Sequence, residues 1–273
     1  MTSERHDDGL SVGEPDDSAG LFGPSTQTWR LHSEPLLGLA ILRGLLLGAL
    51  HPANPAASDD VWLRLSRAVE VVGAITFGTP GQALAVAARE RIEQSMRGLD
   101  DLAAWHHCCQ VDSVVEVLRR SGVALDDEQA DRYVAEQVSS ATLLGLEPDE
   151  VPTDLVGVQD VLREMRPDLG ASTDARADIG EVVAPSVLVD RIPVPRPPWA
   201  AVAGLAYAAL PSWARRLYAM PGLPGAAALH GAATTVALHT LRSSLRGTPG
   251  VPEVAPTPHV RTARERLAAP PES

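Results

Sequence analysis

Two histidines and two cysteines stand side by side in the segment AAWHHCCQVDSVVEVLRR, residues 103–120. These residue types are common ligands of metal ions. The segment has the periodicity of an amphipathic helix, and a helical wheel places His107 on the apolar face. His106, turned by about 100°, falls on the flank of that face. The apolar face consists of Val111, Val114, Val115 and Leu118.

A histidine on an apolar face needs partners for its ring nitrogens, because an unsatisfied buried polar group is costly. A polar neighbour in the core would provide them, and so would a metal ion. The spacing leaves both interpretations open. On the opposite face the wheel places Asp112, Glu116 and Arg119, which we expect to be solvated.

Structural zinc is not expected at the His-His-Cys-Cys run. Four adjacent residues of one helix point in different directions and cannot converge on one tetrahedral ion. Cys108 and Cys109 are the only cysteines, so no second pair with zinc-finger spacing exists. The chain also lacks a G-x-S-x-G elbow and a Gly-rich phosphate loop, which argues against a serine hydrolase.

Basic residues also occur on apolar stretches elsewhere. Arg64 lies in line with Ala68 and Val71, whereas Arg67 turns toward the polar side of the same predicted helix. A guanidinium cannot lose its charge, so Arg64 requires an anion or a carboxylate unless it snorkels at the edge of the core.

Arg43 and His51 are eight residues apart on one side of the first predicted helix. A structurally paired arginine and a helix-end histidine would explain them separately. Together with Arg64 and His107, however, they place basic groups on the apolar faces of three helices. Such an arrangement would suit a large anionic cofactor inside a helical bundle.

The elements that must position these residues are helical. Hydrophobic residues make up 45% of the chain but aromatic residues only 4%, so the core must come mostly from aliphatic side chains. Asp127 and Thr153 are predicted N-caps, and Gly122 and Gly145 are predicted C-terminal glycines. Helices are expected near 34–50, 59–76, 80–97, 100–121, 127–144, 153–165, 174–184, 198–209, 211–219 and 223–245.

We therefore predict one all-α domain, a multi-helix bundle at residues 26–246, between an acidic disordered segment at 1–25 and a Pro-rich disordered tail at 247–273. A short charged segment of the tail has weak helical character. The proline-dense stretch 191–199 is expected to run extended.

The charge of the chain excludes several functions. Net charge is −12, and all 23 basic residues are arginine, so binding to nucleic acid is not expected. The apolar runs at 35–50 and 199–210 are shorter than the roughly 20 residues that cross a bilayer, so we expect buried helices and no membrane contact. Adjacent cysteines and a polar N-terminus without signal-peptide features predict a cytoplasmic protein.

Residues 30–246 resemble a known family in the order and spacing of their motifs. The chain resembles the MpaB and rubber-oxygenase (latex clearing protein) catalytic-domain family. The segments that carry the resemblance are SEPLLGLAILRGLLLGALHP, WLRLSRAVEVVGAITFGT, AWHHCCQVDSVVEVLRRSG, LDDEQADRYVAEQVSSATLLGLEPDEVP, MRPDL and PPWAAVAGLAYAALPSWARRLYAMP.

The resemblance implies an all-helical domain that binds haem b and acts with dioxygen on a small apolar substrate, such as an isoprenoid or lipid-like chain. The family's W-x-H-x-x-x-x-D-S segment begins here at Trp105, which makes His107 the axial ligand of the iron. An arginine important near the haem in rubber-cleaving members matches Arg64, and Arg67, Arg43 and His51 are further candidates for cofactor contacts.

Two alternatives remain open. The family's threonine four residues after the arginine is Ala68 here, and the segment after His51, ANPAASDD, is shorter than in relatives. These departures motivate the hypothesis of a degenerate member that serves, without haem, as a helical binding or interaction module. A non-haem metal hydrolase that uses His51, His106 and His107 is the other alternative.

Overall fold

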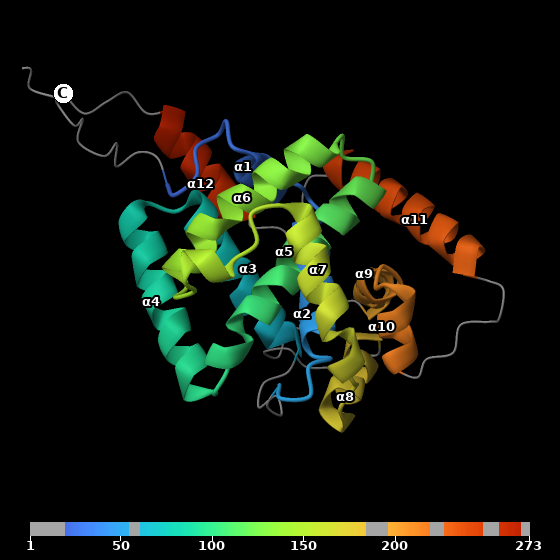
Figure 1. The fold of residues 1–273 in the computed structure, drawn as a ribbon. Coiled ribbons are helices and arrows are strands. Elements are labelled where there is room, and N and C mark those ends of the chain that lie inside the picture. The colour runs from blue at the N-terminus through green and yellow to red at the C-terminus, as the bar shows by residue number, and fades with distance from the viewer. Residues whose placement is uncertain (1–19, 55–60, 184–195, 219–226, 248–256, 269–273) are drawn as a thin grey trace, which may run out of the picture.

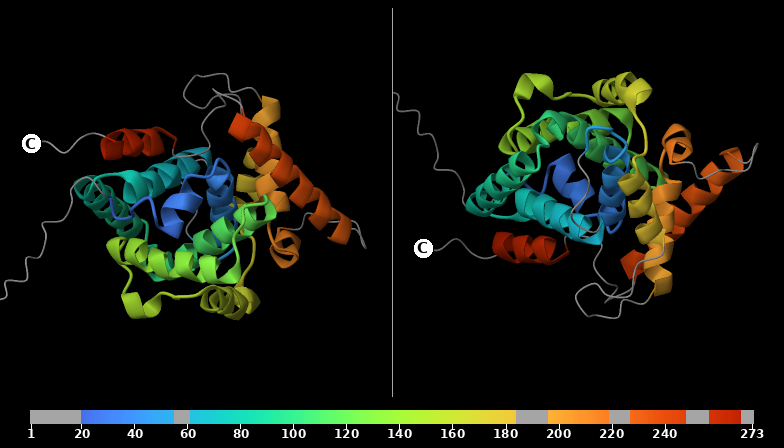
Figure 2. Two further views of the ribbon diagram at one scale, coloured as in Figure 1. Left: turned by 90° about the horizontal axis from the view of Figure 1, so that it is seen from above. Right: turned by 90° about the horizontal axis from the view of Figure 1, so that it is seen from below.

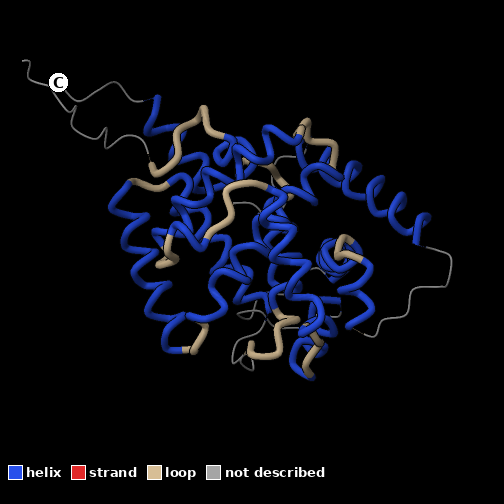
Figure 3. Tube along the Cα trace, viewed as in Figure 1, coloured by secondary structure: helices blue, strands red, loops and turns tan. Residues whose placement is uncertain are grey.

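The structure, a computed structural model, describes residues 20–54, 61–183, 196–218, 227–247 and 257–268. Within these ranges the chain forms twelve α-helices and three short 3-10 turns, and no strand occurs (Figures 1 and 3). The all-α prediction is confirmed. The first six helices are α1 (Gln27–His32), α2 (Leu37–Gly48), α3 (Val61–Phe77), α4 (Pro80–Met96), α5 (Ala103–Arg120) and α6 (Asp127–Leu143).

The remaining helices are α7 (Leu155–Met165), α8 (Thr173–Val183), α9 (Arg196–Ala208), α10 (Ser212–Leu217), α11 (Ala227–Gly247) and α12 (Thr257–Ala268). The 3-10 turns are η1 (Asp100–Leu102), η2 (Pro148–Glu150) and η3 (Arg166–Asp168). Seen from above and below, α3, α4, α5 and α6 surround α1 and α2, while α9, α10 and α11 lie on one side (Figure 2).

Capping side chains define where several helices begin. Thr79 caps α4 in a capping box with Gln82, and Asp126 caps α6 in the same way with Gln129. The predicted caps Asp127 and Thr153 are each one residue away from the true ones, because Asp126 and Asp154 accept the backbone N–H bonds.

Two predicted C-terminal glycines are confirmed. Gly122 and Gly145 follow α5 and α6 with φ of +84° and +101°, a conformation that side chains with a Cβ rarely adopt. These glycines let the chain reverse direction directly after each helix.

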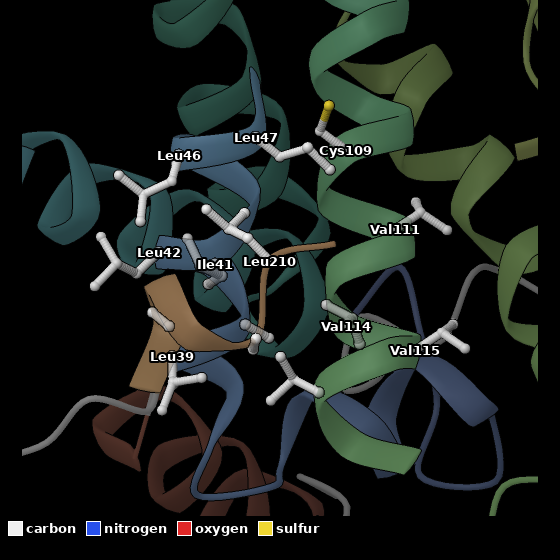
Figure 4. Close-up of a cluster of buried hydrophobic side chains, with 14 of the residues drawn as sticks. Leu39, Ile41, Leu42, Leu46, Leu47, Cys109, Val111, Val114, Val115 and Leu210 are labelled. Carbon is white, nitrogen blue, oxygen red and sulfur yellow. The ribbon is translucent and has the colours of Figure 1, made fainter. Parts of the chain in front are cut away.

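Helix α2 occupies the centre of the protein. Apart from Leu45, all of its residues are buried, which agrees with the prediction of a buried helix at 35–50. Its largest packing partner is α5, and Figure 4 shows Leu47 of α2 directed toward Cys109 of α5. No helix among the described residues has both the length and the apolar character needed to cross a bilayer.

Glycines allow α2 and α5 to approach closely. A Cβ on Gly44 would lie 2.5 Å from the Gln110 carboxamide, and one on Gly48 would lie 2.8 Å from the His106 ring. The carbonyl of Gly48 also accepts a hydrogen bond of 3.0 Å from the indole N–H of Trp105. The C-terminal end of α2 is therefore held tightly against the first turns of α5.

Two segments differ from the sequence predictions. Within the predicted Pro-rich tail, residues 257–268 form α12, because Val260 and Ala263 pack with Trp29 and Phe77. Of the stretch expected to be extended, residues 191–195 lie outside the described residues, but 196–199 begin α9. Prolines fit there because the first turn of a helix does not use its backbone N–H groups.

The glycine contact at Gly48 yields a stability prediction. Gly48→Ala would force the His106 ring away from α2, which we expect to lower the free energy of unfolding by about 1–2 kcal/mol. Urea denaturation followed by circular dichroism measures the change. Gly204→Ala in α9 is the control, since no atom lies within 4 Å of its Cβ, and it should leave stability unchanged or raise it by up to about 1 kcal/mol. Equal effects of the two substitutions would contradict close packing.

Candidate functional site

A cavity of about 270 Å³ lies between α2, α3, α4, α5 and α6. Its size is near the lower end of the roughly 300–1,000 Å³ that small-molecule sites usually have. About half of the residues that line it are aliphatic, and that part of the wall is suited to an apolar molecule, while the rest are polar or charged, with Glu90 and Glu93 among them. The aliphatic wall includes Leu37, Ile41, Leu45, Val71, Val72, Ile75, Val111 and Val114.

Both histidines of α5 line this cavity. Burial lowers the pKa of His107 to about 4. Burial also lowers the pKa of His106 to about 4, with smaller contributions from the charges of His51, Arg97 and Arg64. Both rings are therefore neutral at pH 7, which is the protonation state in which an imidazole binds a metal.

His107 is directed inward, as the helical wheel predicts, but none of the described residues forms a hydrogen bond with its ring. The first of the two interpretations, a core histidine hydrogen-bonded to a polar neighbour, therefore finds no such neighbour among the described residues. His106, which the wheel places on the flank, reaches the same cavity because Gly48 leaves room for its ring. The structure thus brings two neutral imidazoles to one apolar wall.

Arginines from two segments reach the same cavity. Arg64 and Arg67 of α3 and Arg97 after α4 line it, and so does Ala68. The side chain of Arg64 is 12% exposed and pairs with Asp178 of α8. Its Nε is buried and has no hydrogen-bond partner within the described part of the chain. Arg67 lies 3.5 Å from Glu93 and is more exposed, so it sits at the rim of the cavity.

Arg43 lies elsewhere. Its side chain is 3% exposed and lines a different cavity, on the other side of α5. Nη1 donates to Asp112 at 2.8 Å and to the Ser113 hydroxyl at 2.6 Å, and Nε donates to the carbonyl of Ala209 at 3.0 Å. The guanidinium is thus bound by the protein itself.

His51, at the end of α2, is half-buried, and its ring centroid lies 6.3 Å from that of Trp105. Its Nδ1 accepts a hydrogen bond from the backbone N–H of Ala53. It is not part of the cavity wall, although its charge affects His106. Of the predicted site residues, the structure therefore brings together His107, Arg64 and Arg67.

The prediction of a solvated Asp112 is wrong. Its side chain is only 16% exposed because it pairs with Arg43 of α2. A helical wheel compares residues within one helix and contains no information on the charge that a neighbouring helix presents. Asp112 and Ser113, which end the W-x-H-x-x-x-x-D-S pattern, have a definite structural task here, which is to hold a buried arginine.

A polar group of residues at the cavity was missed in the sequence. His32 of α1 lies 2.7 Å from the Thr76 hydroxyl through Nδ1 and 3.1 Å from the Tyr133 hydroxyl through Nε2. Burial lowers the pKa of His32 to about 3 and raises the pKa of Tyr133. Gln137 and Ser140 of α6 also line the cavity. Tyr133 and Gln137, four residues apart on one face of α6, could have indicated a polar group in the sequence. His32 gave no such indication, because it lies before the first predicted helix.

Residues 29–243 match the family model described as ER-bound oxygenase mpaB/B'/Rubber oxygenase, catalytic domain. The chain belongs to this family. The match covers most of the chain and confirms the resemblance found in the motifs. No curated protein and no solved structure matches the chain.

Membership of this family indicates that the domain containing the cavity is oxygenase-like. The segment that places His107 on the cavity wall is one that carries the resemblance, and so is the helix of Arg64. Across the described part of the chain, no three His, Cys, Asp or Glu side chains are grouped as a metal site. His51, His106 and His107 thus do not form a three-ligand set.

The buried ion pair yields a second stability prediction. Asp112→Ala would leave the Arg43 guanidinium buried without its carboxylate, which we expect to cost about 3 kcal/mol of unfolding free energy. Arg132→Ala, which removes a pair with Glu128 on the exposed face of α6, should cost less than about 0.5 kcal/mol. Chemical denaturation measures the unfolding free energy of both variants. A decrease of less than about 1 kcal/mol for Asp112→Ala would show that the pair is solvated.

A pH dependence follows from His32. In the unfolded chain its pKa is about 6.5, whereas in the folded protein it is about 3. Between these values the unfolded state binds the extra proton, so stability falls as the pH falls from 6.5 toward 3. The contribution of His32 is about 2 kcal/mol between pH 7 and pH 5. His32→Gln should flatten the plot of unfolding free energy against pH by that amount, and an unchanged plot would contradict burial of a neutral ring.

Proposed function

We propose that the chain is a haem b-dependent oxygenase that acts with dioxygen on a small apolar substrate, such as an isoprenoid or lipid-like chain. The observation that carries the proposal is the ring of His107, which is neutral, only partly exposed, and without a hydrogen-bond partner among the described residues, on the wall of a partly aliphatic cavity. Membership of an oxygenase family supports the reaction class.

The residues at the cavity fit the parts of a haem group. A neutral imidazole suits the iron, and an aliphatic wall suits the porphyrin ring. The buried Nε of Arg64, which has no acceptor, suits a propionate carboxylate, and Arg67 and Arg97 provide further positive charge near the rim. In this proposal His107 would bind the haem iron, and Arg64 and Arg67 would lie near the haem, where they could hold its propionates or contact dioxygen.

When bound, haem supplies the activation of dioxygen, which no amino-acid side chain provides. The protein contributes the environment. The aliphatic wall would hold an apolar substrate and exclude water, and the neutral histidines add no charge to its interior. His32 and Tyr133 form an uncharged hydrogen-bonding group, which could orient a hydroxyl or carbonyl of a substrate.

A haem-free binding module is the competing proposal. Ala68 on the cavity wall carries no hydroxyl at the position where rubber-cleaving relatives have threonine. The shortened segment after His51 runs largely through residues 55–60, which lie outside the described residues. Such a module would use the same aliphatic cavity to bind an apolar ligand without chemistry.

We also propose a cytoplasmic location and no nucleic-acid partner. Both cysteines are free buried thiols, which a reducing compartment would keep reduced. The net charge of −12 opposes binding to nucleic acid.

The deciding measurement is the absorption spectrum of protein produced with ample haem precursor. We expect a Soret band in the parent, a haem b pyridine haemochrome, and loss or a shift of the band in His107→Ala, with added imidazole restoring it. Arg64→Gln should lower haem affinity while leaving the band position nearly unchanged, because it changes a propionate contact and not the ligand.

His106→Ala and His259→Ala serve as matched controls, one on the same cavity wall and one at the surface beside Glu70. Both should retain the parent spectrum. Loss of the band in His106→Ala alone would assign the axial ligand to His106. A folded parent without a Soret band would remove the oxygenase proposal and favour the binding module, whereas oxygen uptake with apolar substrates would test turnover in a haem-loaded protein.

A further inference from the structure

A second cavity, of about 480 Å³, lies on the other side of α5, against α7, α9, α10 and α11. It is lined by more charged side chains, with fewer aliphatic ones, than the first cavity. We propose that this cavity binds a small phosphate-bearing anion, held chiefly by Arg166 and Arg215. The proposal is independent of haem binding, since none of the residues that carry it lines the first cavity.

The charge of this cavity is opposite to that of the chain. Five arginines line it, against two carboxylates, although the whole chain has 35 acidic and 23 basic residues. Three of the arginines are neutralised by carboxylates, in the pairs Arg43–Asp112, Arg120–Glu116 and Arg163–Asp160. Arg166 and Arg215 have no carboxylate partner among the described residues, so the cavity keeps a surplus of positive charge.

Arg166 contacts an aromatic ring of the cavity wall. Its guanidinium carbon lies 4.9 Å from the centroid of the Trp213 ring, over the indole, in a cation–π contact. No hydrogen bond of its guanidinium is seen among the described residues, so its N–H groups are available. A planar edge with parallel N–H groups is the geometry that binds two oxygens of one phosphate.

Arg215 has a related need for an anion. Its Nη1 donates to the carbonyl of Ala208 at 3.0 Å. Burial lowers the pKa of Arg215, Tyr207 raises it, and the positive charges of Arg120 and Arg216 lower it by smaller amounts. Arg120 already has Glu116 as a partner, whereas an anion in the cavity would supply the counter-charge that Arg215 lacks among the described residues.

One further donor lines the site. The hydroxyl of Thr235 lines the same cavity, whereas the ring of His230 there is directed by Nε2 to the carbonyl of Ala208. Two unpaired guanidinium groups match a dianion at neutral pH better than a monoanion, which favours phosphate or a phosphate ester over a carboxylate. The size of the cavity is suited to a small molecule and not to a nucleic-acid strand or a membrane surface.

The test is isothermal titration of the full chain with inorganic phosphate and with inorganic pyrophosphate, at constant ionic strength set with chloride. We expect saturable binding of at least one of them, together with a higher melting temperature at saturation. Arg166→Gln, at an exposed position, should weaken binding roughly 10- to 100-fold, and Arg215→Gln should do the same.

Arg132→Gln, which removes an exposed arginine of α6 that does not line the cavity, is the matched control and should bind like the parent. Circular dichroism of each variant verifies that it is folded. Preference for pyrophosphate over phosphate would point to a diphosphate ester as the natural ligand, and the reverse preference would point to a monophosphate. Absence of saturable binding, or equal binding by Arg166→Gln and the parent, would overturn the proposal.

Discussion

Arg43 must keep its charge inside the protein, and the residues that neutralise it determine how the central helices meet. Its guanidinium reaches from α2 to Asp112 and Ser113 of α5 and to a carbonyl after α9. A buried charge with incomplete partners is strongly unfavourable, so these three segments have little freedom to slide. Gly48 adds a steric condition, because only a residue without a Cβ admits the His106 ring at that distance.

These contacts fix which sides of α5 face its neighbours, and in our proposals the two sides have different functions. His106 and His107 face the aliphatic cavity formed with α3, α4 and α6. Asp112 and Glu116 face the polar cavity formed with α7, α10 and α11. One helix therefore separates a partly aliphatic cavity from a more basic one, and Arg43 and Asp112 line the second.

Electrostatics distinguish the two cavities as well. In the first, burial keeps His32, His106 and His107 neutral, so the interior carries no histidine charge at neutral pH. Positive charge is confined to the arginines, of which Arg64 already has Asp178 as a partner. In the second, arginines exceed carboxylates, and the stacking of Arg166 on Trp213 stabilises a cation without neutralising it.

The sequence by itself determined the helical class, the approximate bounds of α2 to α11, the family, and the inward direction of His107. Each of these depends on local periodicity or on a motif within one segment. Only the tertiary structure decided that Arg43 pairs with a carboxylate 69 residues later, or that His32 meets Tyr133 across 101 residues. Only the tertiary structure shows that His106 lines the cavity and that α12 packs against Trp29 and Phe77. The physical reason is that a helical pattern fixes which side of a helix is apolar, whereas the choice of polar partners depends on which distant helix packs against that side.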